Sequence, residues 1–141
     1  MFGSTASVFA LKGSDIDMVV FNKEVKFVTL IDEIHKRLLK VKAFEYVERI
    51  YASVPILKLK DNKTGLNVDI AFNRDDGIYG CLVTVFSGIL YPELRPLYFV
   101  LKSFLREREL DQTRKGGVCS FMLINMLVYF LQQQYKEGKV N

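Results

Sequence analysis

The sequence predicts an α+β fold in two lobes: a mixed β-sheet lobe over residues 1–88 and an α-helical lobe over residues 89–141. Up to residue 72, the sequence contains short segments with strand patterns and one segment with helical spacing. This pattern is typical of strands accompanied by a helix. From about residue 77 onward the apolar residues recur at helical spacing, so the second lobe should consist of helices.

In the first lobe, residues 1–7 are predicted to form a strand end and a turn of small residues. Residues 15–21 alternate and end in β-branched side chains, which favours a strand. Residues 28–42 carry apolar side chains at helical spacing, which predicts an amphipathic helix. Residues 54–60 and 66–72 flank a short stretch rich in turn formers, so we expect them to pair as a hairpin.

In the second lobe, residues 94–109 are predicted to be a helix, with Pro96 near its start, where a missing N–H is harmless. Residues 118–131, after Gly116 and Gly117, are hydrophobic nearly all round, which predicts a buried helix. That segment is shorter than the ~20 residues that span a bilayer. Since no signal-peptide pattern is present either, we expect a soluble, intracellular protein with no membrane partner.

The composition restricts the chemistry. Half of the 141 residues are hydrophobic, enough for a real core, and the net charge of +4 suits a polyanionic partner. Cys81 and Cys119 lie in apolar surroundings and are expected to be buried free thiols. A single histidine, His35, excludes a zinc site built from Cys and His, because such a site needs about four ligands.

Three carboxylates are the candidate catalytic and metal-binding residues: Asp15 and Asp17 in Ser-Asp-Ile-Asp, and Asp69 in Asn-Val-Asp-Ile. On a strand, Asp15 and Asp17 project to one side, so Ile16 and Met18 are expected to turn into the core. Adjacent carboxylates repel each other unless a cation lies between them, and Mg²⁺ is the natural ion because it prefers carboxylate and phosphate oxygens. If the two strands are neighbours, all three carboxylates converge.

An Asp-x-Asp pair alone is better interpreted as an exposed strand edge or a turn. Gly3 and Ser4 change that interpretation, because a glycine lets the backbone approach phosphates and the neighbouring N–H and hydroxyl groups can donate to them. A Gly-Ser turn, an Asp-x-Asp strand and a third Asp on a later strand together resemble the nucleotidyltransferases of the DNA polymerase β superfamily.

The second half is similar to a narrower family. Residues 94–110 (Leu-Arg-Pro-Leu-Tyr-Phe-Val-Leu-Lys-Ser-Phe-Leu-Arg-Glu-Arg-Glu-Leu) and 116–132 (Gly-Gly-Val-Cys-Ser-Phe-Met-Leu-Ile-Asn-Met-Leu-Val-Tyr-Phe-Leu-Gln) resemble the central domain of noncanonical poly(A) polymerases and terminal uridylyltransferases. The nuclear-surveillance type of poly(A) polymerase is the most similar. The resemblance extends from residue 2 to about residue 133. It implies a polymerase β-like sheet lobe followed by a helical poly(A) polymerase-associated lobe.

The resemblance also implies residue roles. Asp15, Asp17 and Asp69 would be the catalytic residues and the ligands of two Mg²⁺ or Mn²⁺ ions. Nucleotide binding would fall to Gly3 and Ser4 at the triphosphate, Lys102 and Arg106 at the phosphates, Ser120 beside them, and Phe121 stacking on the base. Residues i and i+4 share a helix face, so Lys102 and Arg106 can address one polyanion. The alternatives are ordinary surface charge for Lys102 and Arg106, and a core position for Phe121.

The sequence also departs from the family. Many relatives have an Asn-Thr pair for the ribose where this chain has Gly80 and Cys81. Relatives also have a helix and a strand before the Gly-Ser turn and a nucleotide-recognition segment after the last helix. Both ends are therefore expected to be truncated.

The predicted function is a template-independent RNA 3′-terminal nucleotidyltransferase that adds AMP from ATP by two-metal phosphoryl transfer. One alternative is a catalytically incomplete fragment, or an RNA- or protein-binding subunit that keeps the fold. Others are a uridylyltransferase and a nucleotidyltransferase acting on a small molecule. The expected partners are an RNA 3′ end and a nucleoside triphosphate. The family resemblance adds a zinc-knuckle RNA-binding protein, a helicase, and a nuclear rather than cytoplasmic location.

Overall fold

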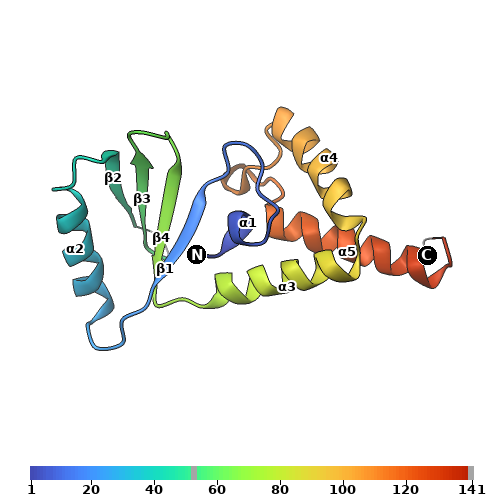
Figure 1. Cartoon of the computed structure of the whole chain (residues 1–141), viewed down its shortest axis with the longest axis horizontal. Helices are drawn as coiled ribbons and strands as arrows, with labels where there is room; N and C mark the ends of the chain where they lie inside the picture. Colours follow the sequence, from blue (N-terminus) through green and yellow to red (C-terminus); the bar gives the residue numbers. More distant parts are fainter. Residues whose placement is uncertain (52–53, 140–141) are drawn as a thin grey trace. The chain divides into compact units, whose positions relative to one another are not determined.

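The computed structural model describes residues 1–51 and 54–139 (Figure 1). The chain divides into two compact units, one comprising Met1–Cys81 and the other beginning at Leu82. The sequence had suggested a boundary near residue 88. Both positions lie inside one helix, α3 (Asp76–Leu90).

The first unit contains a four-stranded mixed sheet in the order β1-β4-β3-β2. The central strands are β3 and β4, which pair antiparallel, while β1 runs parallel to β4 and β2 runs antiparallel to β3. The α+β fold class and the hairpin predicted from the sequence are therefore confirmed. The strands are β1 (Ile16–Val20), β2 (Phe44–Ile50), β3 (Ile56–Asp61) and β4 (Asn67–Phe72).

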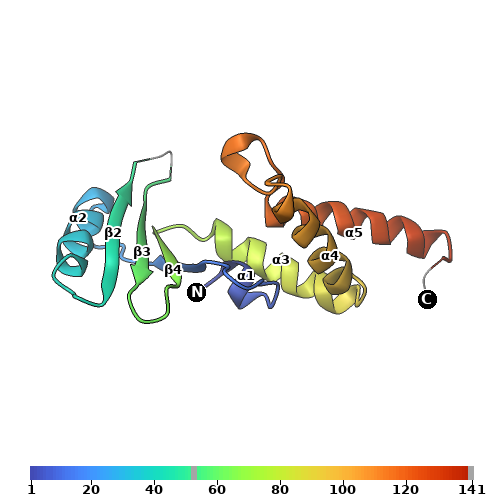
Figure 2. The ribbon, with the colours of Figure 1, turned by 90° about the horizontal axis from the view of Figure 1, so that it is seen from above.

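One face of the sheet is covered by α2 (Phe27–Leu38), which lies alongside the strands in both ribbon views (Figures 1 and 2). Strand residues alternate between faces, so the apolar side chains of β3 and β4 meet this helix while their polar neighbours face the other way. The resulting core consists of Leu30, Ile31, Leu57, Leu59, Ile70 and Phe72. The opposite face is mainly polar and carries Asp17, Lys58 and Asp69.

Strand β2 was not predicted, and its residues explain why. A bulge between Phe44 and Tyr46 interrupts the pairing with β3, and a bulge breaks the period of two that identifies a strand. In addition, β2 is an edge strand, and most of its side chains are exposed or half-buried. Its sequence therefore lacks the alternation of apolar and polar residues shown by β4.

Two expectations for the first residues need correction. Residues 3–6 form one helical turn, α1 (Gly3–Ala6), instead of an irregular turn, and the strand end is reduced to a single bridge between Phe2 and Asp17. Met18 was expected in the core but is 40% exposed. It shares a row with Ile70 on the helix-covered face, but β1 lies at the sheet edge, where cover is incomplete.

The second unit is helical, as predicted. It contains the end of α3, then α4 (Leu94–Glu107), a 3₁₀ turn at Thr113–Lys115 and α5 (Ser120–Lys136). Helix α5 was expected to be buried all round, and this was wrong. Only one side is buried, and the opposite side exposes Met126 (58%) and Phe130 (49%). The buried side consists of Leu123, Ile124, Leu127 and Leu131.

Among the described residues, no single helix has the length and hydropathy needed to cross a membrane. Within the part of the chain that the structure describes, α3 and α4 taken together, as a sharply bent pair, meet those two criteria.

Candidate active site

The polar face of the sheet brings the predicted carboxylates together. Asp17 on β1 and Asp69 on β4 are direct partners in the parallel pairing, so they lie side by side on the same face. Asp15 lies two residues before Asp17 and is held by Asn67, whose side-chain amide donates to its Oδ1 over 3.2 Å. Residues that are more than 50 positions apart in the sequence thus form one acidic cluster.

The cluster is electrostatically strained. Burial, followed by the charges of Asp69 and Asp15, raises the pKa of Asp17 from 3.8 to about 6, and the nearby Lys58 acts in the opposite direction. The ammonium of Lys58 lies 3.0 Å from Oδ2 of Asp69. The other oxygen, Oδ1, is buried and accepts no hydrogen bond from the described residues. The three carboxylates therefore carry more negative charge than the single ammonium of Lys58 neutralises.

These residues fit a divalent metal ion. Carboxylate oxygens are the ligands that Mg²⁺ prefers, and an unpaired buried oxygen next to a destabilised carboxylate is an environment that a hard cation would neutralise. Asp15, Asp17 and Asp69 are the residues that would hold it. In residues 1–51 and 54–139, however, no three acidic, His or Cys side chains already stand at metal-ligand spacing. The carboxylates must close further around an ion to coordinate it.

The turn that carries Gly3 and Ser4 borders this cluster, with Gly3 against Asp17. The backbone N–H of Phe2 donates to the Asp17 carbonyl (2.9 Å), and the Thr5 hydroxyl donates to the Asp15 carbonyl (3.2 Å), so α1 is tied to β1. Gly3 has a φ of +71°, and a Cβ at this position would lie 2.7 Å from Cγ of Asp17. Only glycine fits, because any side chain would both strain the backbone and displace the carboxylate. The turn and the acidic strand form one structural element.

Gly80 and Cys81, which the resemblance aligns with an Asn-Thr pair in many relatives, belong to the first turns of α3. The Cys81 thiol donates to the Gly3 carbonyl over 3.8 Å, so this segment borders the same turn. Both cysteines are free, and both are half-buried instead of buried as expected. A thiol in this position can donate only weakly, which leaves the ribose contact that the resemblance implies unassigned.

In the helical unit, Lys102 forms an ion pair with Asp111, with 3.0 Å between Nζ and Oδ2. The two side chains are only 12% and 18% exposed. Sequence reasoning missed Asp111, because it lies in a loop that has no periodicity to reveal its direction. Two apolar neighbours of Lys102 on α4 are exposed, Val100 by 69% and Phe104 by 46%. The burial of Lys102 therefore comes from its own side of α4.

Arg106 and Ser120 are related to the same side of α4. Tyr98, Lys102 and Arg106 are spaced by four residues and so share one helix face. Tyr98 is fully buried, and its hydroxyl is hydrogen-bonded to the side chain of Ser120, the first residue of α5. The ring of Phe121 is 48% exposed, so it does not occupy a core position. Tyr98 thus connects Ser120 on α5 to the face of α4 that carries Lys102.

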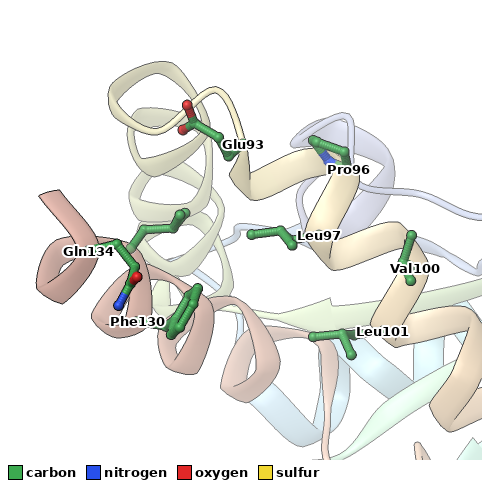
Figure 3. Close-up of a pocket in the computed structure, with 8 residues that line it drawn as sticks. Glu93, Pro96, Leu97, Val100, Leu101, Phe130 and Gln134 are labelled. Atoms are coloured by element: carbon green, nitrogen blue, oxygen red, sulfur yellow. The ribbon is translucent and has the colours of Figure 1, made fainter. Parts of the chain in front are cut away.

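A separate groove lies between α4 and α5 (Figure 3). It has a volume of about 540 Å³ and is mainly apolar. None of the predicted nucleotide-binding residues lines it. The lining residues are Glu93, Pro96, Leu97, Val100, Leu101, Phe130, Leu131 and Gln134.

The five residues of the first motif, Gly3, Ser4, Asp15, Asp17 and Asp69, lie in the sheet unit. The other four, Lys102, Arg106, Ser120 and Phe121, lie in the helical unit. Within each unit the predicted residues are neighbours. Their roles in binding and catalysis remain predictions.

Comparison with known proteins connects this geometry to a family. Residues 1–86 match the family described as "Poly(A) RNA polymerase, mitochondrial-like, central palm domain". The chain is 36% identical over 139 residues to Poly(A) RNA polymerase cid14 of Schizosaccharomyces pombe, covering 94% of this chain and 20% of that protein. It is 34% identical over 136 residues to Poly(A) RNA polymerase gld-4 of Caenorhabditis elegans, covering 94% and 16%. The chain therefore spans about a fifth of the length of these curated relatives.

Solved structures agree with these relatives. The polymerase core of TRAMP, an RNA surveillance complex, superposes with a TM-score of 0.85 at 28% identity, covering 99% of this chain and 45% of that one. The Cid1 poly(U) polymerase with Mg and 3′-dATP bound gives 0.81 at 26% identity, covering 92% and 41%. Polymerase cores of this family use divalent metal ions and nucleoside triphosphates. By its palm sequence, its fold and its relatives, the chain belongs to the noncanonical poly(A) polymerase family of nucleotidyltransferases.

Proposed function

We propose that this chain carries the catalytic core of a template-independent RNA 3′-terminal nucleotidyltransferase that adds AMP from ATP. The observation that carries the proposal is the acidic row on the sheet, with Asp17 and Asp69 in register and Asp15 beside them. This row borders the Gly3 turn inside a poly(A) polymerase palm sequence.

In this proposal Asp15, Asp17 and Asp69 hold two Mg²⁺ or Mn²⁺ ions. When bound, the ions lower the pKa of the attacking 3′-hydroxyl and offset the charge of the leaving pyrophosphate. The chain itself mainly positions the reactants and compensates charge, so no histidine base is needed. Gly3 lets the turn lie directly against the Asp17 carboxylate, because it lacks a side chain there, and its backbone can approach a phosphate closely.

The helical residues supply the other nucleotide contacts. Lys102 has three N–H donors, so it can keep Asp111 and still donate to a terminal phosphate. Arg106, one turn further on α4, adds a second positive charge, and Ser120 lies beside that face. The half-exposed ring of Phe121 offers a surface on which the base can stack.

ATP is proposed as the substrate because curated relatives at 36% and 34% identity are poly(A) polymerases. The alternative is UTP, because a poly(U) polymerase shares the fold at nearly the same TM-score. Extension of a labelled RNA primer with each of the four nucleoside triphosphates, in Mg²⁺ and in Mn²⁺, separates the two.

The direct test compares primer extension by the chain, by Asp15→Ala/Asp17→Ala and by Glu45→Gln. Glu45 is an exposed carboxylate on edge strand β2 and serves as the matched control. Because the chain spans about a fifth of its curated relatives, the three versions should also replace the matching segment of Poly(A) RNA polymerase cid14. Extension with ATP that survives in the control and disappears in the double variant is expected. Undiminished extension by the double variant would refute the proposal.

Protein partners form part of the same proposal. Relatives include the polymerase core of TRAMP and a GLD-2/RNP-8 complex. We propose that this chain likewise works with a zinc-knuckle RNA-binding protein and a helicase, in the nucleus. Purification of the tagged chain from nuclear and cytoplasmic fractions, followed by identification of bound proteins, tests both statements.

A further inference from the structure

Lys58 occupies a special place on the polar face of the sheet. It is the direct partner of Asp69 in the β3–β4 pairing, and Asp69 is in turn the direct partner of Asp17 in the β4–β1 pairing. Partners across a sheet project from the same face. Lys58, Asp69 and Asp17 therefore form one straight row across three adjacent strands.

The ammonium of Lys58 forms an ion pair with the central carboxylate of this row. Its Nζ lies 3.0 Å from Oδ2 of Asp69, and the two side chains are 27% and 21% exposed. Partial burial strengthens such a pair relative to one on the open surface. The second oxygen of Asp69 has no hydrogen-bond partner among the described residues, so Lys58 is the contact that the structure shows for this carboxylate.

A second carboxylate is available to Lys58 on its other side. Glu48 is its direct partner in the β2–β3 pairing and is exposed. The lysine is thus flanked by Asp69 toward the cluster and by Glu48 toward the sheet edge. A flexible side chain with four methylene groups can exchange one for the other without movement of the strands.

We propose that Lys58 is the resident counter-ion of the acidic cluster, which it stabilises without metal and from which it moves toward Glu48 when divalent ions bind. The inference rests on the proposed function. With Lys58, three carboxylates and one ammonium carry a formal charge of −2, which one divalent ion neutralises. A second ion then needs additional negative charge, which a nucleoside triphosphate supplies. Without Lys58 the carboxylates carry −3, so Lys58 raises the charge that nucleotide must supply for two divalent ions from one unit to two.

The consequence for metal affinity has a clear sign. The Lys58 ammonium, 3.0 Å from Oδ2 of Asp69, repels a divalent ion. It also occupies an Asp69 oxygen that could otherwise bind the ion. Removing the charge should tighten binding of a free divalent ion about tenfold or more, since pairs at partly buried sites interact more strongly than exposed ones. Keeping the charge should leave the affinity unchanged.

The experiment measures Mn²⁺ binding to the metal-free chain through the electron paramagnetic resonance signal of free Mn²⁺. Lys58→Met and Lys58→Gln remove the charge, and Lys58→Arg keeps it. Lys60→Met is the matched control, because Lys60 lies on the same strand and face but pairs with Glu45 at 2.7 Å. Asp17→Asn and Asp69→Asn report whether the ion occupies the cluster. Circular dichroism establishes that each variant is folded.

The expected result is tighter Mn²⁺ binding by both neutral variants, with Lys58→Arg and Lys60→Met like the original chain. A non-hydrolysable ATP analogue should reduce the difference, because its phosphates offset the lysine charge. Equal or weaker Mn²⁺ binding by the neutral variants would overturn the role of Lys58 while leaving the metal site intact. Mn²⁺ binding that is unaffected by the Asp17 and Asp69 substitutions would overturn the metal site itself, and this inference with it.

Discussion

The ionised carboxylate of Asp17 should lower the free energy of unfolding of the metal-free chain. Its pKa is raised from 3.8 to about 6 by burial, then by the charges of Asp69 and Asp15. A carboxyl whose folded-state pKa is raised favours the folded state when protonated. That contribution is complete below pH 3.8 and is lost as the pH rises through about 6. The Asp17→Asn variant keeps the shape of the protonated acid and cannot ionise.

The magnitude follows from the shift. One pKa unit corresponds to about 1.4 kcal/mol, so the full shift corresponds to about 3 kcal/mol, of which roughly 2 kcal/mol is expressed between about pH 4.5 and 7.5. In buffer with EDTA, Asp17→Asn should therefore be more stable than the original chain by about 3 kcal/mol at about pH 7.5 and by only about 1 kcal/mol at about pH 4.5.

Urea unfolding followed by circular dichroism at the two pH values measures this difference. Asp76→Asn is the control, because its partner Arg74 lowers the pKa of Asp76, so neutralising Asp76 should bring no gain at neutral pH. Addition of Mg²⁺ should stabilise the original chain more than Asp17→Asn, since binding to the folded state stabilises it. If Asp17→Asn were no more stable than the original chain at neutral pH, burial and the neighbouring carboxylates would not be raising the pKa of Asp17.

Three further substitutions test the other elements. Gly3→Ala should lower the free energy of unfolding by about 1–3 kcal/mol, because its φ of +71° and the adjacent Asp17 carboxylate both disfavour a side chain; urea unfolding measures this, and an unchanged midpoint would contradict the close approach. Lys102→Met should destabilise the chain by about 1–3 kcal/mol, since it leaves Asp111 largely buried without its cation; adding Asp111→Asn should recover much of the loss, and no recovery would mean that the pair is not coupled. Phe121→Ala should change stability by less than about 1 kcal/mol, because the ring is half-exposed, yet weaken nucleotide binding by about 1–3 kcal/mol if the base stacks on it; fluorescence titration with a labelled ATP analogue measures the binding, and equal affinity would remove Phe121 from the site.

Local patterns were sufficient where apolar and polar residues fall on different faces of an element. The alternation in residues 66–72 predicted β4 and placed Asp69 on its polar face, and the helical spacing in residues 94–109 predicted α4. Strand β2 escaped prediction because its bulge breaks the period and its edge position leaves few buried side chains. The exposed side of α5 escaped for the opposite reason, because its composition is apolar on every side and so does not show which side has a neighbour.

Local patterns could not predict which residues distant in sequence form ion pairs. Alternation in residues 56–61 turns Lys58 to the polar face, but only the β3–β4 register brings it opposite Asp69. Asp111 lies in a loop, and nothing in its immediate sequence points to Lys102. An ion pair depends on where two backbones lie in space, and the residues next to each partner carry no record of that.

The sequence by itself determined the chemistry available to this protein: two carboxylates two residues apart, a third on another strand, and a Gly-Ser turn before them all. Spacing along one strand fixes which side chains share a face, because the backbone geometry of a strand is local. The tertiary structure decided that β1 runs parallel to β4 with Asp17 opposite Asp69, and that Lys58 completes the row. Strand pairing depends on contacts between distant segments and on the burial of a shared core, so only the folded chain could decide it.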